Sequence, residues 1–254
     1  MLGFQGTQVN FKSVLESTGS DKSASLKSIA DALEKQLTKT PIDQGSTNIV
    51  WFVRTLSDLL SPGTEKLSIE AKDSLLIVEA KLAKSQRDVR VRIYFGLTDL
   101  LTNADAEYWK SLAYGLGHDD VVLYTGHSGL GENMKLSHLL AATGLTENDL
   151  LRTAPANQVI GIFSCYSYSY FGEEIAQARA RVGSGNTTHY LRTSSAFSTE
   201  LGHLKVLEQI DLMHSTGSRS PASVEFEPTD FVIGTRYEVD STPNRILGRA
   251  KGLL

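Results

Sequence analysis

The sequence predicts an α/β fold with a mostly parallel central sheet, and three observations support this. Short apolar segments alternate along the chain with segments whose apolar residues are spaced three or four apart, as in amphipathic helices. Several of the short segments are almost continuously apolar, which is typical of strands buried on both faces. The chain has 254 residues, of which 41% are hydrophobic and 21% charged, so it can bury a sizeable core. We therefore expect helices on both faces of the sheet and functional sites at the carboxyl ends of its strands.

The predicted strands differ in their apolar pattern. Residues 48–53, NIVWFV, and residues 157–165, NQVIGIFSC, are nearly continuous apolar runs. Residues 88–95 alternate apolar and polar side chains, which predicts a strand with one solvated face. The remaining strands are expected at residues 120–124, 189–197 and 230–239.

Helices are predicted where the apolar spacing has a helical period. They are residues 26–37, 67–82, 103–116, 135–151 with a break near Gly144, 172–181 and 204–214. Because the first predicted strand begins only at residue 48, we expect residues 1–45 to form an N-terminal helical appendage. Residues 46–254 would then form the main domain.

Composition excludes several classes of partner. The formal net charge is −4, so no strongly basic surface is expected for nucleic acid or an anionic membrane. No apolar stretch approaches the ~20 residues needed to span a bilayer, and the first twelve residues lack the features of a signal peptide. We expect a soluble protein, whose compartment and oligomeric state the sequence does not give. The single cysteine excludes a disulfide framework.

The glycine-rich loop after residues 120–124 allows more than one kind of chemistry. Gly126 and Ser128 match the start of the G-x-S-x-G nucleophile elbow of α/β hydrolases, but Leu130 stands where its second glycine is needed. Backbone N–H groups of such loops can also bind phosphate, yet there is no G-x-G-x-x-G pattern and no following lysine. Both interpretations are therefore disfavoured.

His127 and Cys165 form the candidate catalytic pair. Each comes at the carboxyl end of a predicted buried strand, and one helical crossover separates the two strands. Consecutive parallel strands usually lie side by side, about 4.8 Å apart, so the two side chains would emerge at the same edge. An imidazole next to a thiol favours the nucleophilic thiolate. The alternative is an inert buried cysteine and an ordinary loop histidine.

The two motifs that end in these residues, VVLYTGHSG and VIGIFSC, resemble those of the caspase-like superfamily of cysteine peptidases. In element order the resemblance covers roughly residues 47–239. It implies a three-layer αβα sandwich with a mostly parallel central sheet, a peptide or protein substrate, and no metal or cofactor. It also implies that Cys165 attacks the peptide carbonyl and that His127 transfers the protons.

The resemblance further implies an oxyanion hole and a substrate pocket. The backbone N–H groups of Cys165 and of Ser128 or Gly129 would bind the oxyanion. In the family a glycine normally follows the histidine, and here it is Ser128, so a catalytically silent binding module is the alternative function. Ser194 and Ser195 stand where relatives shape the pocket, with an ordinary polar loop as the alternative. Tyr166 is a further candidate for the pocket, although packing against one face of an extended segment is the favoured interpretation. The other histidines show no spacing typical of a zinc site.

Overall fold

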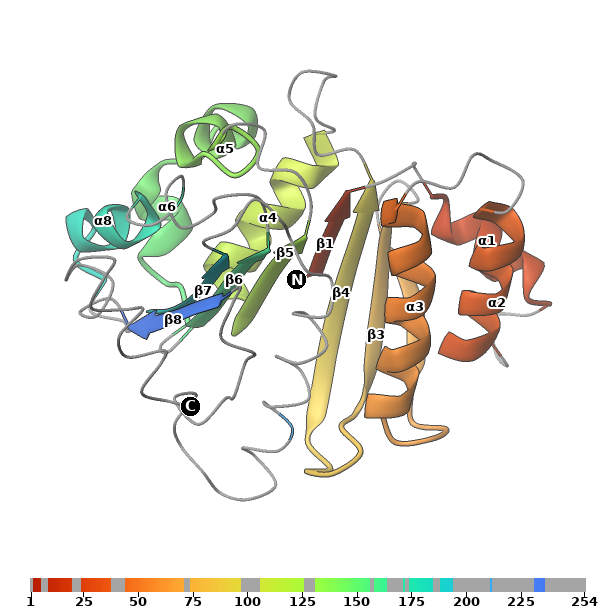
Figure 1. The fold of residues 1–254 in the computed structure, drawn as a ribbon. Coiled ribbons are helices and arrows are strands. Elements are labelled where there is room, and N and C mark those ends of the chain that lie inside the picture. Colours follow the sequence, from red (N-terminus) through yellow and green to blue (C-terminus); the bar gives the residue numbers. More distant parts are fainter. Residues whose placement is uncertain are drawn as a thin grey trace. The chain divides into compact units, whose positions relative to one another are not determined.

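The computed structural model divides the chain into two compact units (Figure 1). The N-terminal unit holds the described residues of Leu2–Leu97 together with Asp211, and the C-terminal unit holds those of Thr98–Thr199 and Glu225–Leu254. The described residues are 2–5, 9–19, 24–37, 44–70, 74–96, 106–125, 131–155, 158–163, 171, 174–184, 188–193, 211 and 231–235. Both units combine helices with a mixed sheet, so the predicted α/β class is confirmed at this level.

The sheet of the N-terminal unit is mostly antiparallel. Its strand order is β2-β3-β4-β1, with β2 at Lys66–Glu70, β3 at Leu75–Lys81, β4 at Asp88–Gly96 and β1 at Leu2–Gln5. The pairs β2–β3 and β3–β4 are antiparallel, and only β1 runs parallel to β4. The expectation of a mostly parallel sheet therefore does not hold in this unit.

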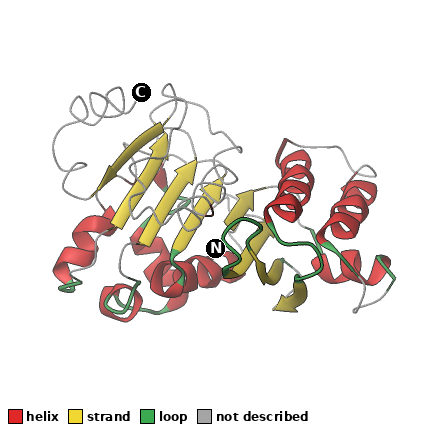
Figure 2. Ribbon diagram, turned by 90° about the horizontal axis from the view of Figure 1, so that it is seen from below, coloured by secondary structure: helices red, strands yellow, loops and turns green. Residues whose placement is uncertain are grey.

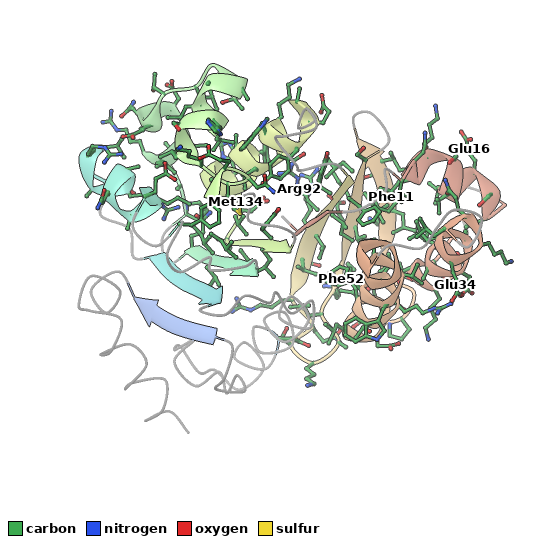
Figure 3. The ribbon with its side chains drawn as sticks, turned by 45° about the horizontal axis from the view of Figure 1, so that its top comes forward. Phe11, Glu16, Glu34, Phe52, Arg92 and Met134 are labelled. Carbon is green, nitrogen blue, oxygen red and sulfur yellow. The ribbon has the colours of Figure 1, made fainter. Side chains whose placement is uncertain are left out.

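The helices of the N-terminal unit are α1 at Phe11–Ser17, α2 at Leu26–Leu37 and α3 at Gln44–Leu59. The bounds of α2 agree with the prediction, and its helical apolar repeat is buried against α1 and α3. Figure 3 labels two buried and two exposed side chains of these helices. Phe11 and Phe52 are buried, whereas Glu16 and Glu34 are exposed on the outer surfaces.

The strand predicted at residues 48–53 is wrong, because this run lies inside α3. Within it Ile49, Phe52 and Val53 are buried, while Trp51 is 41% exposed. A six-residue apolar run does not distinguish a strand from a buried helix segment, and the helical repeat becomes clear only when the window extends to Leu56.

The predicted domain boundary also falls inside α3. That boundary separates an N-terminal appendage, residues 1–45, from a main domain, residues 46–254. The two units that the structure shows instead divide the chain after Leu97.

The helix predicted at residues 67–82 is also wrong, because β2 and β3 lie there. Leu67 and Ile69 are more buried than their neighbours in β2, an alternation typical of a strand at the edge of a sheet. In β3, residues 75–78 are all buried, as expected for an inner strand. The predicted solvated face of β4 is wrong at its carboxyl half, since Arg92 and Tyr94 are buried.

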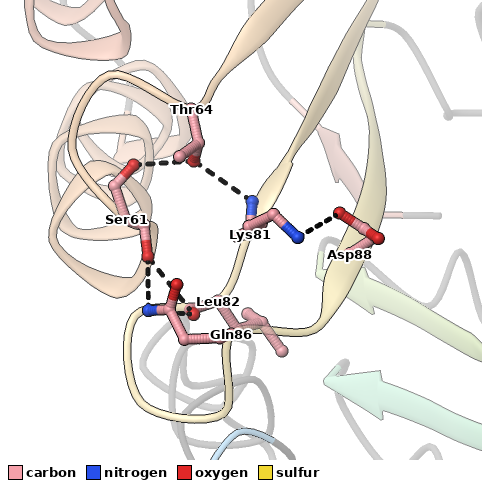
Figure 4. A network of polar contacts seen from close by, with 6 residues as sticks. All are labelled: Ser61, Thr64, Lys81, Leu82, Gln86 and Asp88. Carbon is pink, nitrogen blue, oxygen red and sulfur yellow. Dashed lines mark hydrogen bonds and ion pairs between the residues drawn. The ribbon is translucent and has the colours of Figure 1, made fainter.

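The β3–β4 hairpin is fixed by a network of polar contacts (Figure 4). Gln86 adopts a left-handed conformation with φ of 56°, and its amide donates to Ser61 Oγ and to the Ala83 carbonyl, both at 2.8 Å. The Lys81 backbone N–H donates to Thr64 Oγ1 at 3.2 Å. The residues after α3 are thereby fastened to the start of the hairpin turn.

A buried carboxylate closes the same turn from a distant part of the sequence. Asp211 is 1% exposed and accepts the backbone N–H of Ser85 at 2.9 Å and that of Lys84 at 3.1 Å. Burial by itself would raise the pKa of Asp211, but hydrogen bonding to Ser85 and Lys84 outweighs burial and lowers this pKa below its usual range.

The sheet of the C-terminal unit begins with three parallel strands. Its order is β5-β6-β7-β8, with β5 at Val121–Thr125, β6 at Gln158–Phe163, β7 at Thr188–Thr193 and β8 at Phe231–Thr235. The pairs β5–β6 and β6–β7 are parallel, and β8 is antiparallel to β7. The four strands predicted in this part of the chain are confirmed, with bounds that differ from the predicted ones by one to four residues.

The helices of the C-terminal unit are α4 at Ala106–His118, α5 at Leu136–Thr143, α6 at Glu147–Leu151 and α8 at Glu174–Arg181. Figure 2 shows them along one side of the strands of this unit. The break predicted near Gly144 is confirmed, since this glycine ends α5 with φ of 72°. The helix predicted at 204–214 lies outside the described residues except for Asp211.

Candidate functional site

The predicted site residues fall in the three chain segments that follow β5, β6 and β7, here termed the three loops. These residues, namely His127, Ser128, Gly129, Cys165, Tyr166, Ser194 and Ser195, lie outside the described part of the chain. The described residues show how the strands before the loops are arranged, and which contacts hold the chain after two of them.

The last residues of the three strands are aligned. Thr125 of β5 lies opposite Phe163 of β6. Ile162 lies opposite Arg192, so Phe163 and Thr193, the last residues of β6 and β7, are next in the same register. Because these strands are parallel neighbours, all three loops leave from one edge of the sheet.

The chain after the first loop is held by α4. The hydroxyl group of Tyr108 donates to the Asn133 carbonyl at 2.7 Å, and its ring lies 6.3 Å from the ring of Tyr124 in β5. Tyr108 itself is completely buried. One side chain thus contacts the residues on both sides of the loop that carries His127.

A hydrogen bond joins the two helices that follow the His127 and Cys165 loops. Glu174 Oε2, in the first residue of α8, accepts the backbone N–H of Leu136, the first residue of α5, at 3.1 Å. In the sequence, Leu136 comes nine residues after His127, and Glu174 comes nine residues after Cys165. The chain segments that follow the two loops therefore meet at this contact.

Glu132 forms a small charged cluster at the start of α5. Its carboxylate lies 3.0 Å from Lys135 Nζ and 3.2 Å from His138 Nδ1. These side chains are about two-fifths exposed, so solvent screens their interaction. The cluster orients the segment after the loop without burying a charge.

The amino end of β6 is fixed by a buried polar network. Gln158 is fully buried, and its Nε2 donates to the carbonyl oxygens at the end of α4, at 3.2 Å to Gly115, 3.3 Å to Leu116 and 2.5 Å to Asp119. Arg179 of α8, 1% exposed, donates from Nη2 to Gln158 Oε1. The strand β6, which leads to Cys165, is thus anchored to α4, which precedes it in the sequence, and to α8, which follows it.

Tyr108, Glu174, Gln158 and Arg179 were not predicted from the sequence as supporting residues. Glu174 carries a weak signal, because acidic residues are favoured in the first turn of a helix. No local sequence pattern indicates that Glu174 accepts a hydrogen bond from another helix, because Leu136 is 38 residues away in the sequence.

Metal and membrane sites were also considered. In the described ranges no three His, Cys, Asp or Glu side chains are grouped so that they could hold a metal ion. Among the helices of those ranges, none has the length and apolar character that crossing a membrane requires.

No match to the chain was found among protein-family models, curated proteins or solved structures. The residues of this chain and the strands that precede them are therefore the basis of the function proposed below.

Proposed function

We propose that the chain is a cysteine-type endopeptidase of the caspase-like kind, with His127 and Cys165 as its catalytic dyad. The observation that supports this is the register of β5 and β6, parallel neighbours with Thr125 opposite Phe163. His127 and Cys165 each come two residues after this pair.

The register limits how far apart the two residues can lie. Two residues of extended chain span at most about 7 Å, so neither Cα atom can move far from its strand end. Side chains of a strand alternate between the faces with a period of two. If both strands continued in the same direction, His127 and Cys165 would be neighbours about 4.8 Å apart on the same face of the sheet.

The proposed reaction uses the chain's own groups alone. The Cys165 thiolate attacks the carbonyl carbon of a peptide bond, and His127 in its protonated form gives a proton to the departing amine. The neutral imidazole then takes a proton from water, which attacks the resulting thioester. The carboxylic acid product leaves and the Cys165 sulfur is regenerated.

Backbone N–H groups provide the oxyanion site in this proposal. They are those of Cys165 and of Ser128 or Gly129, and donors of this kind contribute about 3 kcal/mol each in well-studied enzymes. Ser194, Ser195 and Tyr166 border the substrate pocket, because β7 ends in register beside β6. The proposal also includes the three-layer αβα sandwich that the resemblance implies.

The test is the rate of alkylation of Cys165 by iodoacetamide between about pH 5 and pH 9. Cys165 is the only cysteine, so the mass of the intact protein reports this thiol alone. We expect fast reaction near neutral pH, and slower reaction with a higher midpoint in His127→Ala, because the imidazole stabilises the thiolate. His118→Ala is the matched control, since its imidazole is exposed at the end of α4 and lies 4.7 Å from the ring of Tyr114.

Two results would contradict the proposal. The first is an alkylation midpoint near the ~8.5 of an ordinary thiol in both the parent and His127→Ala. The second is peptide hydrolysis that survives Cys165→Ala and is lost in Ser128→Ala, which would indicate a serine nucleophile. In the first case, a catalytically silent binding module is the function to test next, because Ser128 stands where the family normally has a glycine.

A further inference from the structure

We infer that Glu174 is a positioning residue for the proposed dyad: its carboxylate holds the end of the Cys165 loop against the end of the His127 loop. The inference rests on the proposed function. It is carried by the hydrogen bond from the Leu136 N–H to Glu174 Oε2, at 3.1 Å, which joins α5 to α8.

The contact satisfies a group that α5 cannot satisfy itself. The first N–H groups of a helix have no acceptor within the helix, and an N-cap side chain usually provides one. The N-cap of α5 is Lys135, whose side chain makes no such bond. Glu174 supplies the acceptor from another helix, and its negative charge interacts favourably with the helix dipole.

The rest of each helix is held by other contacts. Leu136 is 3% exposed, and Tyr108 binds the Asn133 carbonyl just before it. On α8, Arg181 donates to both carboxylate oxygens of Glu147, at 2.9 and 2.5 Å. Loss of the Glu174 contact should therefore loosen the ends of the two loops while both helices remain folded.

Two conservative variants of Glu174 separate the effect of side-chain length from the effect of charge. Glu174→Gln keeps the length and an acceptor oxygen but removes the charge. Glu174→Asp keeps the charge but is shorter by one methylene, so it cannot reach Leu136 N–H without a shift of the helix. Removal of a nearby negative charge would, if anything, lower the pKa of the thiol, so a pure charge effect has the opposite sign.

The experiment measures alkylation of Cys165 by iodoacetamide against pH, together with thermal unfolding, in the full chain. We expect Glu174→Asp to react about fivefold more slowly near pH 7 and with a raised midpoint, because small misplacements of reacting groups are costly. Glu174→Gln should stay within about twofold of the parent. Glu16→Asp, the same change at an exposed residue of α1, is the matched control and should leave the rate unchanged.

The outcomes separate this inference from the proposed function. A fast parent reaction that depends on His127, with no change in Glu174→Asp, overturns the inference and leaves the dyad standing. So does a Glu174→Gln variant as slow as Glu174→Asp. A parent whose thiol behaves as an ordinary one overturns the proposed function itself. A drop in Glu174→Asp matched by a large fall in unfolding temperature would show a structural role only and overturn the inference.

Discussion

The β3–β4 hairpin and the parallel strands β5 to β7 use polar residues differently. At the hairpin, Gln86 and Asp211 bind backbone groups of a single turn, and Asp211 is buried. Along β6, the polar network lies at the amino end, where Gln158 and Arg179 meet. The carboxyl end of β6 leads instead into the loop that contains Cys165.

This difference follows from how the strands are connected. An antiparallel pair can be joined by a tight turn, whose backbone groups must find acceptors and donors close by. Parallel strands need long crossovers, and these bring residues far apart in the sequence to one edge of the sheet. The hairpin therefore shows where polar residues serve the fold, whereas we propose that the polar residues after β5 to β7 serve catalysis.

The largest expected effect comes from breaking the anchor of β6. Gln158→Ala removes the amide group that donates to the carbonyl oxygens of Gly115, Leu116 and Asp119, and it removes the oxygen that the buried Arg179 guanidinium binds. We expect the free energy of unfolding to fall by about 3 kcal/mol, because buried polar groups lose their partners. Urea unfolding followed by circular dichroism measures it.

Gln36→Ala is the control for this change. Gln36 lies on the exposed side of α2, so the same substitution should alter the unfolding free energy by at most about 0.5 kcal/mol. Equal effects of the two variants would show that the network at Gln158 adds no stability.

Elements with a consistent pattern over their whole length could be predicted from the sequence. In α2 the apolar residues keep one helical face from Leu26 to Leu37, and no competing pattern fits. The prediction for residues 48–53 was wrong because a six-residue apolar run fits both a strand and a helix. The prediction for residues 67–82 was wrong because apolar residues of two successive strands also fall at helical spacing. Contacts formed on folding then decide: α3 packs on α2, and β3 lies between β2 and β4.

The site could be predicted only in part, for a similar reason. The strands before His127 and Cys165 were visible as apolar runs, and their parallel pairing followed from the order of the elements. The contacts of Tyr108 with Asn133, and of Glu174 with Leu136, join residues 25 and 38 positions apart. Such pairs depend on how helices pack and leave no periodicity in the sequence.

Loss of the Asp211 carboxylate at the β3–β4 hairpin should lower the free energy of unfolding by less than Gln158→Ala does, and this loss should depend on pH. Asp211→Asn replaces the carboxylate that accepts the N–H groups of Lys84 and Ser85, and we expect a loss of about 1 to 2 kcal/mol near pH 7. The pKa of Asp211 is lowered in the folded chain. Its contribution is therefore complete above the unfolded value, near pH 4, and is lost as the pH falls through the lower folded value.

Urea unfolding of the parent and Asp211→Asn at about pH 7 and pH 3 tests this dependence. The difference between the two proteins should shrink in acid. Asp88→Asn on the same hairpin is the control: the Asp88 side chain is 87% exposed beside Lys81, and at most about 0.5 kcal/mol is expected. A difference that stays constant with pH would contradict the role given to the Asp211 charge.

The smallest expected change in the free energy of unfolding comes from the backbone conformation of Gln86 in the same turn. Its φ of 56° lies in the left-handed region, which costs a residue with a side chain about 1 kcal/mol relative to glycine. Gln86→Ala and Gln86→Gly both lose the bonds to Ser61 and Ala83, but only the glycine removes the strain.

Gln86→Gly should therefore be more stable than Gln86→Ala by about 1 kcal/mol, and close to the parent, because relief of strain offsets the lost hydrogen bonds. Thermal and urea unfolding of the three proteins measure both differences. At a position with ordinary negative φ the order reverses, since glycine has the more flexible unfolded chain. An alanine variant more stable than the glycine variant would thus show that the hairpin turn does not hold Gln86 in the left-handed region, and that its side-chain bonds alone close the turn.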